Sequence, residues 1–185
     1  MWFQMVSLVL DVVAGLLAGT CLLRLLMQRQ RISFHQPVGR FVFALSDWLV
    51  LPLRKVIPSG SAWDLSSLAG AWLIKLAHVS LLWLMSGGHA PGLLLPWFSV
   101  LSLLQLVVSG LSALVLVYAV MSWVNPQSPL NDLVSKLVEP VLRPFRRMMP
   151  LVGGIDLSPL VLLLALQMVG IVLMGLQMDG LRWDQ

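Results

Sequence analysis

Charged residues are scarce in this sequence. Only 11% of the 185 residues are Asp, Glu, Lys or Arg, less than half of the roughly 25% that soluble domains carry. Hydrophobic residues make up 58% of the chain, and the mean hydropathy is +0.90. A core of this size cannot hide several long apolar runs, whereas a bilayer about 30 Å thick needs roughly twenty residues for each crossing. The composition therefore excludes a soluble globular protein and predicts an all-α, multi-pass membrane protein.

Cysteine and histidine are also rare. The single cysteine, Cys21, lies in the first apolar run, so no intramolecular disulfide or thiolate cluster can form. The three histidines, His35, His78 and His89, fall at different predicted depths and do not converge as metal ligands would. Phosphate-binding glycine loops and Ser/His/Asp arrangements are absent from the sequence. We expect no catalytic residue, no metal and no cofactor, and interpret the protein as non-enzymatic.

Four apolar segments are long enough to cross a bilayer. They are residues 2–27, 65–86, 97–124 and 157–178. The first follows Met1 without a basic region, which favours a retained helix over a cleaved signal peptide.

The two long connections between these segments match each other at a constant offset of 92 residues. The identities at this offset place Pro37, Val42, Leu45, Pro52, Arg54, Pro58, Asp64, Leu65, Ser66 and Leu68 on Pro129, Val134, Leu137, Pro144, Arg146, Pro150, Asp156, Leu157, Ser158 and Leu160. A fixed register without gaps indicates an internal duplication. We predict two parallel repeats, residues 1–92 and 93–185.

Basic residues gather in the two long connections. They are Arg24, Arg29, Arg31, Arg40, Arg54 and Lys55 in or beside the first, and Lys136, Arg143, Arg146 and Arg147 in the second. The positive-inside rule then puts both long loops in the cytoplasm and both termini outside. The net charge of +4 is therefore expected to meet anionic lipids rather than nucleic acid.

Each long loop also carries a pattern of apolar residues at helical spacing. After Ser128 as a cap and Pro129 in the first turn, one face collects Leu130, Leu133, Val134, Leu137 and Val138. The counterpart in the first loop runs from about residue 38 to 50. We predict two amphipathic helices that lie in the cytoplasmic membrane interface, the second ended or kinked by Pro140. An ordinary cytoplasmic hairpin without membrane contact is the alternative.

Polar residues inside the apolar segments need partners, because a charge at the centre of a spanning helix costs about 2.5 to 3.5 kcal/mol. Asp11 and Lys75 fall at similar depths of antiparallel segments, so we predict that they pair. Gln105 and Gln167 are their uncharged counterparts in the second repeat. These four residues are either contacts between helices or a path for protons or ions.

Small residues at a spacing of four indicate close helix packing. Gly15 and Gly19 form such a pair in the first segment, and Ser109 and Ala113 form one in the third. The contact lies either within one chain or between the chains of a homo-oligomer.

The second loop resembles the YggT family of bacterial and plastid membrane proteins. The residues that carry the resemblance are Asn125-Pro126, Ser128-Pro129, Glu139-Pro140, Leu142, Pro144, Arg146, Pro150, Gly153-Gly154-Ile155-Asp156 and Ser158-Pro159. Because the duplication carries part of the pattern to the first half, the chain is similar to the two-repeat form, although Ser61-Ala62 replaces the double glycine and Ser67 replaces Pro159.

The motif itself predicts a local structure. Pro150 and Gly153-Gly154 suit a tight turn, and Asp156 or Ser158 can cap the fourth spanning helix. Arg143, Arg146 and Arg147 would then lie at the level of the lipid headgroups or serve only to fix the topology.

The resemblance implies an inner-membrane protein linked to osmotic or ion stress, cell division or the assembly of other components. It implies no reaction. Two functions remain: a non-enzymatic scaffold or assembly factor that binds lipids and membrane or cytoplasmic proteins, and a small channel or transporter. The few intramembrane polar residues favour the scaffold.

Overall fold

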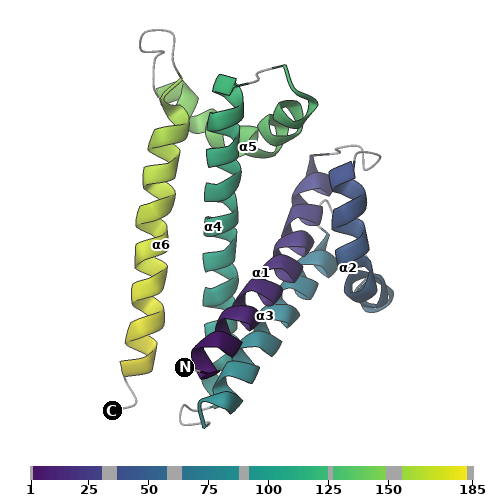
Figure 1. Ribbon diagram of the computed structural model, residues 1–185, viewed down its shortest axis with the longest axis vertical. Helices are drawn as coiled ribbons and strands as arrows, with labels where there is room; N and C mark the ends of the chain where they lie inside the picture. The colour runs from purple at the N-terminus through teal and green to yellow at the C-terminus, as the bar shows by residue number, and fades with distance from the viewer. Residues whose placement is uncertain are drawn as a thin grey trace. The chain divides into compact units, whose positions relative to one another are not determined.

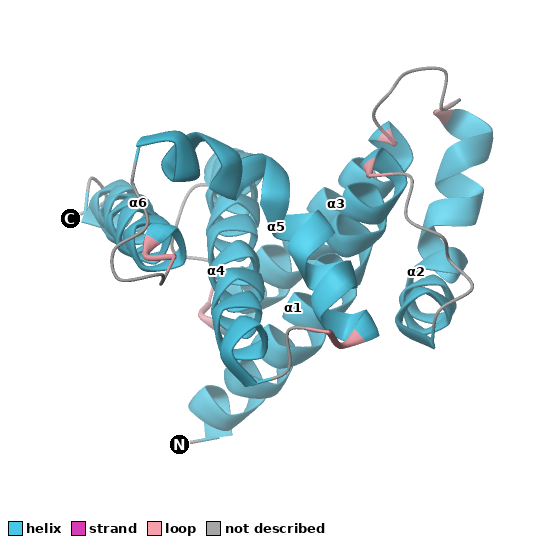
Figure 2. Cartoon of the chain, turned by 90° about the horizontal axis from the view of Figure 1, so that it is seen from above, coloured by secondary structure: helices cyan, strands magenta, loops and turns pink. Residues whose placement is uncertain are grey.

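The computed structural model describes residues 2–30, 37–57, 64–87, 92–124, 127–148 and 156–182. These residues form six α-helices and one short 3₁₀ turn, and contain no strand (Figure 2). The helices are α1 (Trp2–Arg29), α2 (Pro37–Val56), α3 (Leu65–Met85), α4 (Leu95–Val124), α5 (Pro129–Met148) and α6 (Ser158–Arg182), with the 3₁₀ turn η1 (Gly92–Leu94) before α4. The prediction of an all-α protein is confirmed for this part of the chain.

Four of the helices are long and apolar enough to cross a membrane. The candidate spans are Trp2–Arg29, Leu65–Met85, Gly92–Ser122 and Ser158–Gln177. They coincide with the four apolar segments of the sequence. A helix is the form these segments take because it satisfies every backbone N–H and C=O within one segment, as a bilayer demands.

The two remaining helices, α2 and α5, occupy the long connections. Ser128 accepts a hydrogen bond from the Leu130 N–H at 3.2 Å, which confirms it as the cap of α5. Of the two predicted effects of Pro140, an end of the helix is wrong, since α5 continues through Pro140 and Pro144 to Met148, and a kink stays a prediction. Val138 and Leu142 on either side of Pro140 are buried, so packing offsets the hydrogen bond that proline removes. That α2 and α5 lie in the membrane interface stays a prediction.

The chain forms two compact units, and unit 1 comprises residues 1–106 and 176–185. Within it α1 packs against α3, and α2 contacts both (Figure 1). The core combines small and medium side chains from four helices: Ala18, Cys21, Val50, Ala71 and Leu103. Small residues let the helix backbones approach one another closely.

Unit 2 comprises residues 107–175, the second part of α4 with α5 and most of α6. Its core is formed by Val115, Val134, Val138, Leu142 and Leu162. Val134 and Val138 of the apolar face predicted for α5 belong to this core, whereas Leu130 of the same face is exposed. The repeat boundaries at 1–92 and 93–185 stay a prediction.

The glycine pair of α1 does not mark a helix contact within the described chain. A methyl group added at Gly15 or Gly19 would meet no atom within 4 Å. A contact of these glycines with a second chain stays a prediction.

Candidate functional site

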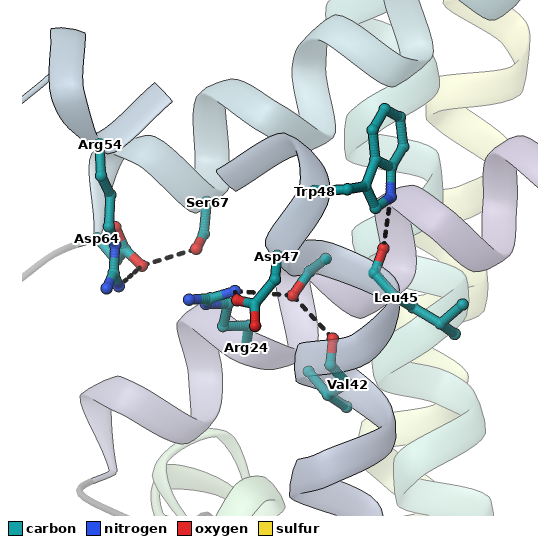
Figure 3. A network of polar contacts seen from close by, with 9 residues as sticks. Arg24, Val42, Leu45, Asp47, Trp48, Arg54, Asp64 and Ser67 are labelled. Carbon is teal, nitrogen blue, oxygen red and sulfur yellow. Dashed lines mark hydrogen bonds and ion pairs between the residues drawn. The ribbon is translucent and has the colours of Figure 1, made fainter. Parts of the chain in front are cut away.

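The first motif pair joins Arg54, in the last turn of α2, to Asp64, which directly precedes α3. The Arg54 Nη2 group donates a hydrogen bond to Asp64 Oδ2 at 2.8 Å. The Ser67 hydroxyl donates to the same oxygen at 2.7 Å (Figure 3). Burial raises the pKa of the Asp64 carboxyl, but the hydrogen bonds from Ser67 and Arg54 outweigh burial and hold this pKa below its usual value. Asp64 is therefore an ionised, buried anchor.

The second motif pair joins Arg146, in the last turn of α5, to Asp156 before α6. Arg146 Nε donates to Asp156 Oδ2 at 2.8 Å, and its Nη2 donates to the Tyr118 hydroxyl on α4. The other oxygen of Asp156 accepts the Ser158 backbone N–H at 2.9 Å. Asp156 is thus the capping residue of α6, rather than Ser158, the other candidate in the sequence.

Electrostatics keeps both members of the second pair charged. Burial raises the pKa of the Asp156 carboxyl, yet hydrogen bonds from Ser158 and Arg146 outweigh burial and lower this pKa overall. Burial lowers the pKa of Arg146, while Asp156 and Tyr118 raise it to a net value above the usual range. The pair is a charge-assisted contact at neutral pH.

The two motif pairs repeat one arrangement. In both, the aspartate follows the arginine by ten positions, and the offset of 92 relates one pair to the other. In both, the end of a connecting helix is tied to the start of a candidate span. Sequence reasoning interprets the arginines as lipid contacts or topology signals and misses the pairing. The repeated spacing of arginine and aspartate is the signal that could have predicted it.

The other motif positions lie around these pairs. Ser66 is fully buried and donates to the Ile57 carbonyl at 3.0 Å. Ser158 and Pro159 are buried in the first turn of α6, Pro52 and Pro144 lie inside α2 and α5, and Arg147 is exposed. Pro58, Pro150, Gly153 and Gly154 lie outside the described residues, so the predicted tight turn stays a prediction.

Arg24 makes a buried contact that sequence reasoning misses. Its side chain is 1% exposed and donates through Nη1 to Asp47 Oδ1 at 2.6 Å and to Ser46 Oγ at 2.9 Å (Figure 3). The guanidinium carbon lies 4.3 Å from the centre of the Phe43 ring, a distance typical of a cation–π contact. From the sequence, Arg24 counts only as a positive charge near the loop. Asp47 is the sole acidic residue from 30 to 63, which is the available signal for its partner.

The intramembrane polar residues are arranged differently from the prediction. Asp11 Oδ1 lies 3.2 Å from His78 Nε2, so His78 makes the direct contact that the sequence assigns to Lys75. The charge of Asp11 still acts on Lys75, so the partnership of these two residues stays a prediction. Lys75 is buried one helical turn before His78 on α3. A histidine at this position shares the face of Lys75, since residues three apart on a helix are neighbours.

The two glutamines belong to different units. The Gln105 Oε1 atom is buried in unit 1 and has no hydrogen-bond partner among the described residues. Gln167 is exposed on α6 in unit 2. Their predicted pairing stays a prediction. The described residues contain no group of three His, Cys, Asp or Glu side chains able to hold a metal ion.

Comparisons with known proteins confirm the family resemblance. The CCB3/YggT family model matches residues 3–85 and again residues 97–177. An uncharacterised protein of Pseudomonas aeruginosa is 33% identical over 172 residues, covering 90% of this chain and 87% of the relative. The protein YggT of Escherichia coli is 33% identical over 165 residues, covering 88% and 86%. A Vibrio alginolyticus protein is 33% identical over 167 residues, covering 89% of each chain. No solved structure matches the chain.

Proposed function

We propose that this chain, which belongs to the CCB3/YggT family, is a non-enzymatic scaffold or assembly and stress-related factor of the bacterial inner membrane. Its basic cytoplasmic face binds anionic lipids, and through them or directly it holds membrane or cytoplasmic protein partners. Both termini lie in the periplasm, and α2 and α5 lie in the cytoplasmic interface as corresponding parts of two parallel repeats.

The division of α5 into two faces carries this proposal. Leu133, Val134, Leu137, Val138 and Leu142 are buried in unit 2. Lys136, Arg143 and Arg147 are exposed. A helix that buries one face in protein and presents cations beside a spanning helix is suited to anionic headgroups, which attract each nearby basic residue by about 1 kcal/mol.

The second motif pair fixes the position of this basic surface relative to α6. The Arg146 guanidinium donates hydrogen bonds to Asp156 and Tyr118, so Arg146 is a structural anchor. Arg143 and Arg147 supply the charge for lipid binding. The anchor holds the end of α5 at the start of α6, where a span meets the headgroups. This assignment separates the roles of three arginines that the sequence treats alike.

Lipid binding by the full-length chain in detergent micelles tests the proposal. Native mass spectrometry should show tighter binding of phosphatidylglycerol than of phosphatidylcholine. Arg143→Gln with Arg147→Gln should weaken binding of the anionic lipid by about 1 kcal/mol per residue, and raised salt should mimic the change. Arg182→Gln, which removes a positive charge from the predicted periplasmic end, is the matched control and should have no effect. Equal binding of both lipids at low salt would sink the lipid role and leave a protein partner as the reason for the arginines.

A small channel or transporter for ion or osmotic homeostasis is the second candidate. The contact of Asp11 with His78 beside Lys75 favours it, because ionisable residues in spans often mark ion or proton pathways. Ion flux into proteoliposomes that contain the purified protein would favour this function, and its absence would favour the scaffold.

A further inference from the structure

Three ionisable side chains gather in the spanning helices of unit 1, apart from both motif pairs. His78 and Lys75 on α3 are 6% and 8% exposed. The His78 ring nitrogen Nε2 lies 3.2 Å from the carboxylate of Asp11 on α1. Neither ring nitrogen of His78 has a hydrogen-bond partner among the described residues. A buried imidazole with unused nitrogens beside a carboxylate is chemically equipped to gain and lose a proton.

The second half of the chain lacks counterparts of these three side chains. At the offset of 92 the second half carries Leu103, Gln167 and Gly170 in place of Asp11, Lys75 and His78. The matching helices α4 and α6 are candidate spans without ionisable residues at these positions. Ionisable groups inside a span are costly and mark function more often than packing. Because the second half carries none of the three residues at these positions, the cluster is a feature of the first half alone.

The members of the cluster differ in burial. The Asp11 side chain is 61% exposed on the surface of unit 1, whereas His78 is buried behind it. A proton that reaches the Asp11 carboxylate therefore has a short path to the imidazole. Protons pass readily between groups at this separation, directly or through one water.

The charges that act on His78 are those of Asp11 and Lys75. The acid Asp47 and the base Arg54 of α2 are engaged with Arg24 and Asp64. The part of α4 within unit 1, residues 95–106, contains no ionisable side chain. A carboxylate favours the imidazolium and an ammonium opposes it, so the two neighbours act on the imidazole in opposite ways.

We propose that Asp11, His78 and Lys75 form an intramembrane proton-exchange site. The neutral imidazole takes one proton at its free ring nitrogen and becomes an imidazolium beside the Asp11 carboxylate. The reverse step returns that proton to water. The ligand of the site is the proton alone, and the three side chains titrate as one coupled group.

Nuclear magnetic resonance of the full-length chain in lipid nanodiscs tests the site. With His35→Gln and His89→Gln, the labelled ring signals report His78 only. We expect the ring to change protonation state between about pH 4 and pH 10, the range that brackets imidazole titration. Asp11→Asn and Lys75→Met should move the midpoint of this curve in opposite senses. Asp11→Glu and Lys75→Arg keep the charges and should retain the wild-type curve.

Gln167→Met changes the position that corresponds to Lys75 in the second half and is the matched control, which should leave the His78 curve unchanged. Helical circular dichroism identifies variants that keep the fold. If the His78 ring keeps one protonation state across this whole pH range, the proposal is overturned, whatever the variants of the cluster show. A titration midpoint that is identical in wild type, Asp11→Asn and Lys75→Met would also overturn it.

Discussion

Arg146 Nε and Asp156 Oδ2 lie 2.8 Å apart, and 92 residues earlier Arg54 Nη2 and Asp64 Oδ2 lie at the same distance. Each pair ties the last turn of a connecting helix to the first residues of a spanning helix. The duplicated pair therefore fixes the same junction twice in one chain. The shared arginine and aspartate thus form a junction between helices in both halves of the chain.

The two motif pairs should differ in strength. The Asp64 side chain is 4% exposed, whereas that of Asp156 is 29% exposed. A double-mutant cycle of Arg54→Gln and Asp64→Asn should give a coupling of about 2 kcal/mol. The cycle of Arg146→Gln and Asp156→Asn should give less than about 1 kcal/mol, because solvent screens the pair. Unfolding free energies in detergent measure both couplings, and a stronger second pair would contradict this ranking.

Acid should weaken both junctions. The pKa values of Asp64 and Asp156 lie below the usual value of about 3.9. Their contribution to stability is therefore fully present above about pH 4 and is lost as the pH falls through the folded-state pKa values. Melting temperatures measured at about pH 6 and about pH 3 should fall less on acidification in Asp64→Asn with Asp156→Asn than in the wild-type chain. An unchanged acid loss in this variant would show that other groups control acid stability.

The Arg24–Asp47 pair should respond asymmetrically to substitution. Asp47→Asn leaves the fully buried Arg24 guanidinium without its counter-charge, a loss of about 3 to 5 kcal/mol. Arg24→Met leaves Asp47, whose side chain is 39% exposed, in contact with solvent or headgroups, and should cost less. Thermal unfolding of the two single variants in detergent gives the order. A larger loss of stability in Arg24→Met than in Asp47→Asn would reverse this expectation.

Much of the fold could be predicted from the sequence because the bilayer imposes one dominant rule: a segment that spans it must be long and apolar. That rule identifies the segments that form α1, α3, α4 and α6, and the Ser128-Pro129 signal places the start of α5. It cannot place the end of α5, since the burial of Leu142 in the core of unit 2 is a tertiary effect.

The polar contacts are harder to predict because they depend on helix rotation. Depth along the membrane points from Asp11 to Lys75, but His78, one turn further along the same face of α3, lies at the carboxylate instead. Arg24 lies near a loop in the sequence, although its side chain turns into the protein toward Asp47. The position of a residue along an apolar segment gives its approximate depth. To predict its partner, the rotation and the exact height of each helix are also needed.

The proposed function requires both motif junctions to lie on the cytoplasmic side of the membrane, and cysteine labelling measures that sidedness. In a Cys21→Ala background, single cysteines replace Ser59 in the first long connection and Gly88 in the short connection after α3. Intact cells are exposed to a membrane-impermeant thiol reagent, and permeabilised cells give the total label at each position. We predict labelling at position 88 and none at position 59 until the cells are permeabilised. Labelling at 59 without labelling at 88 would contradict the proposed function, because the basic face would then lie outside the cytoplasm.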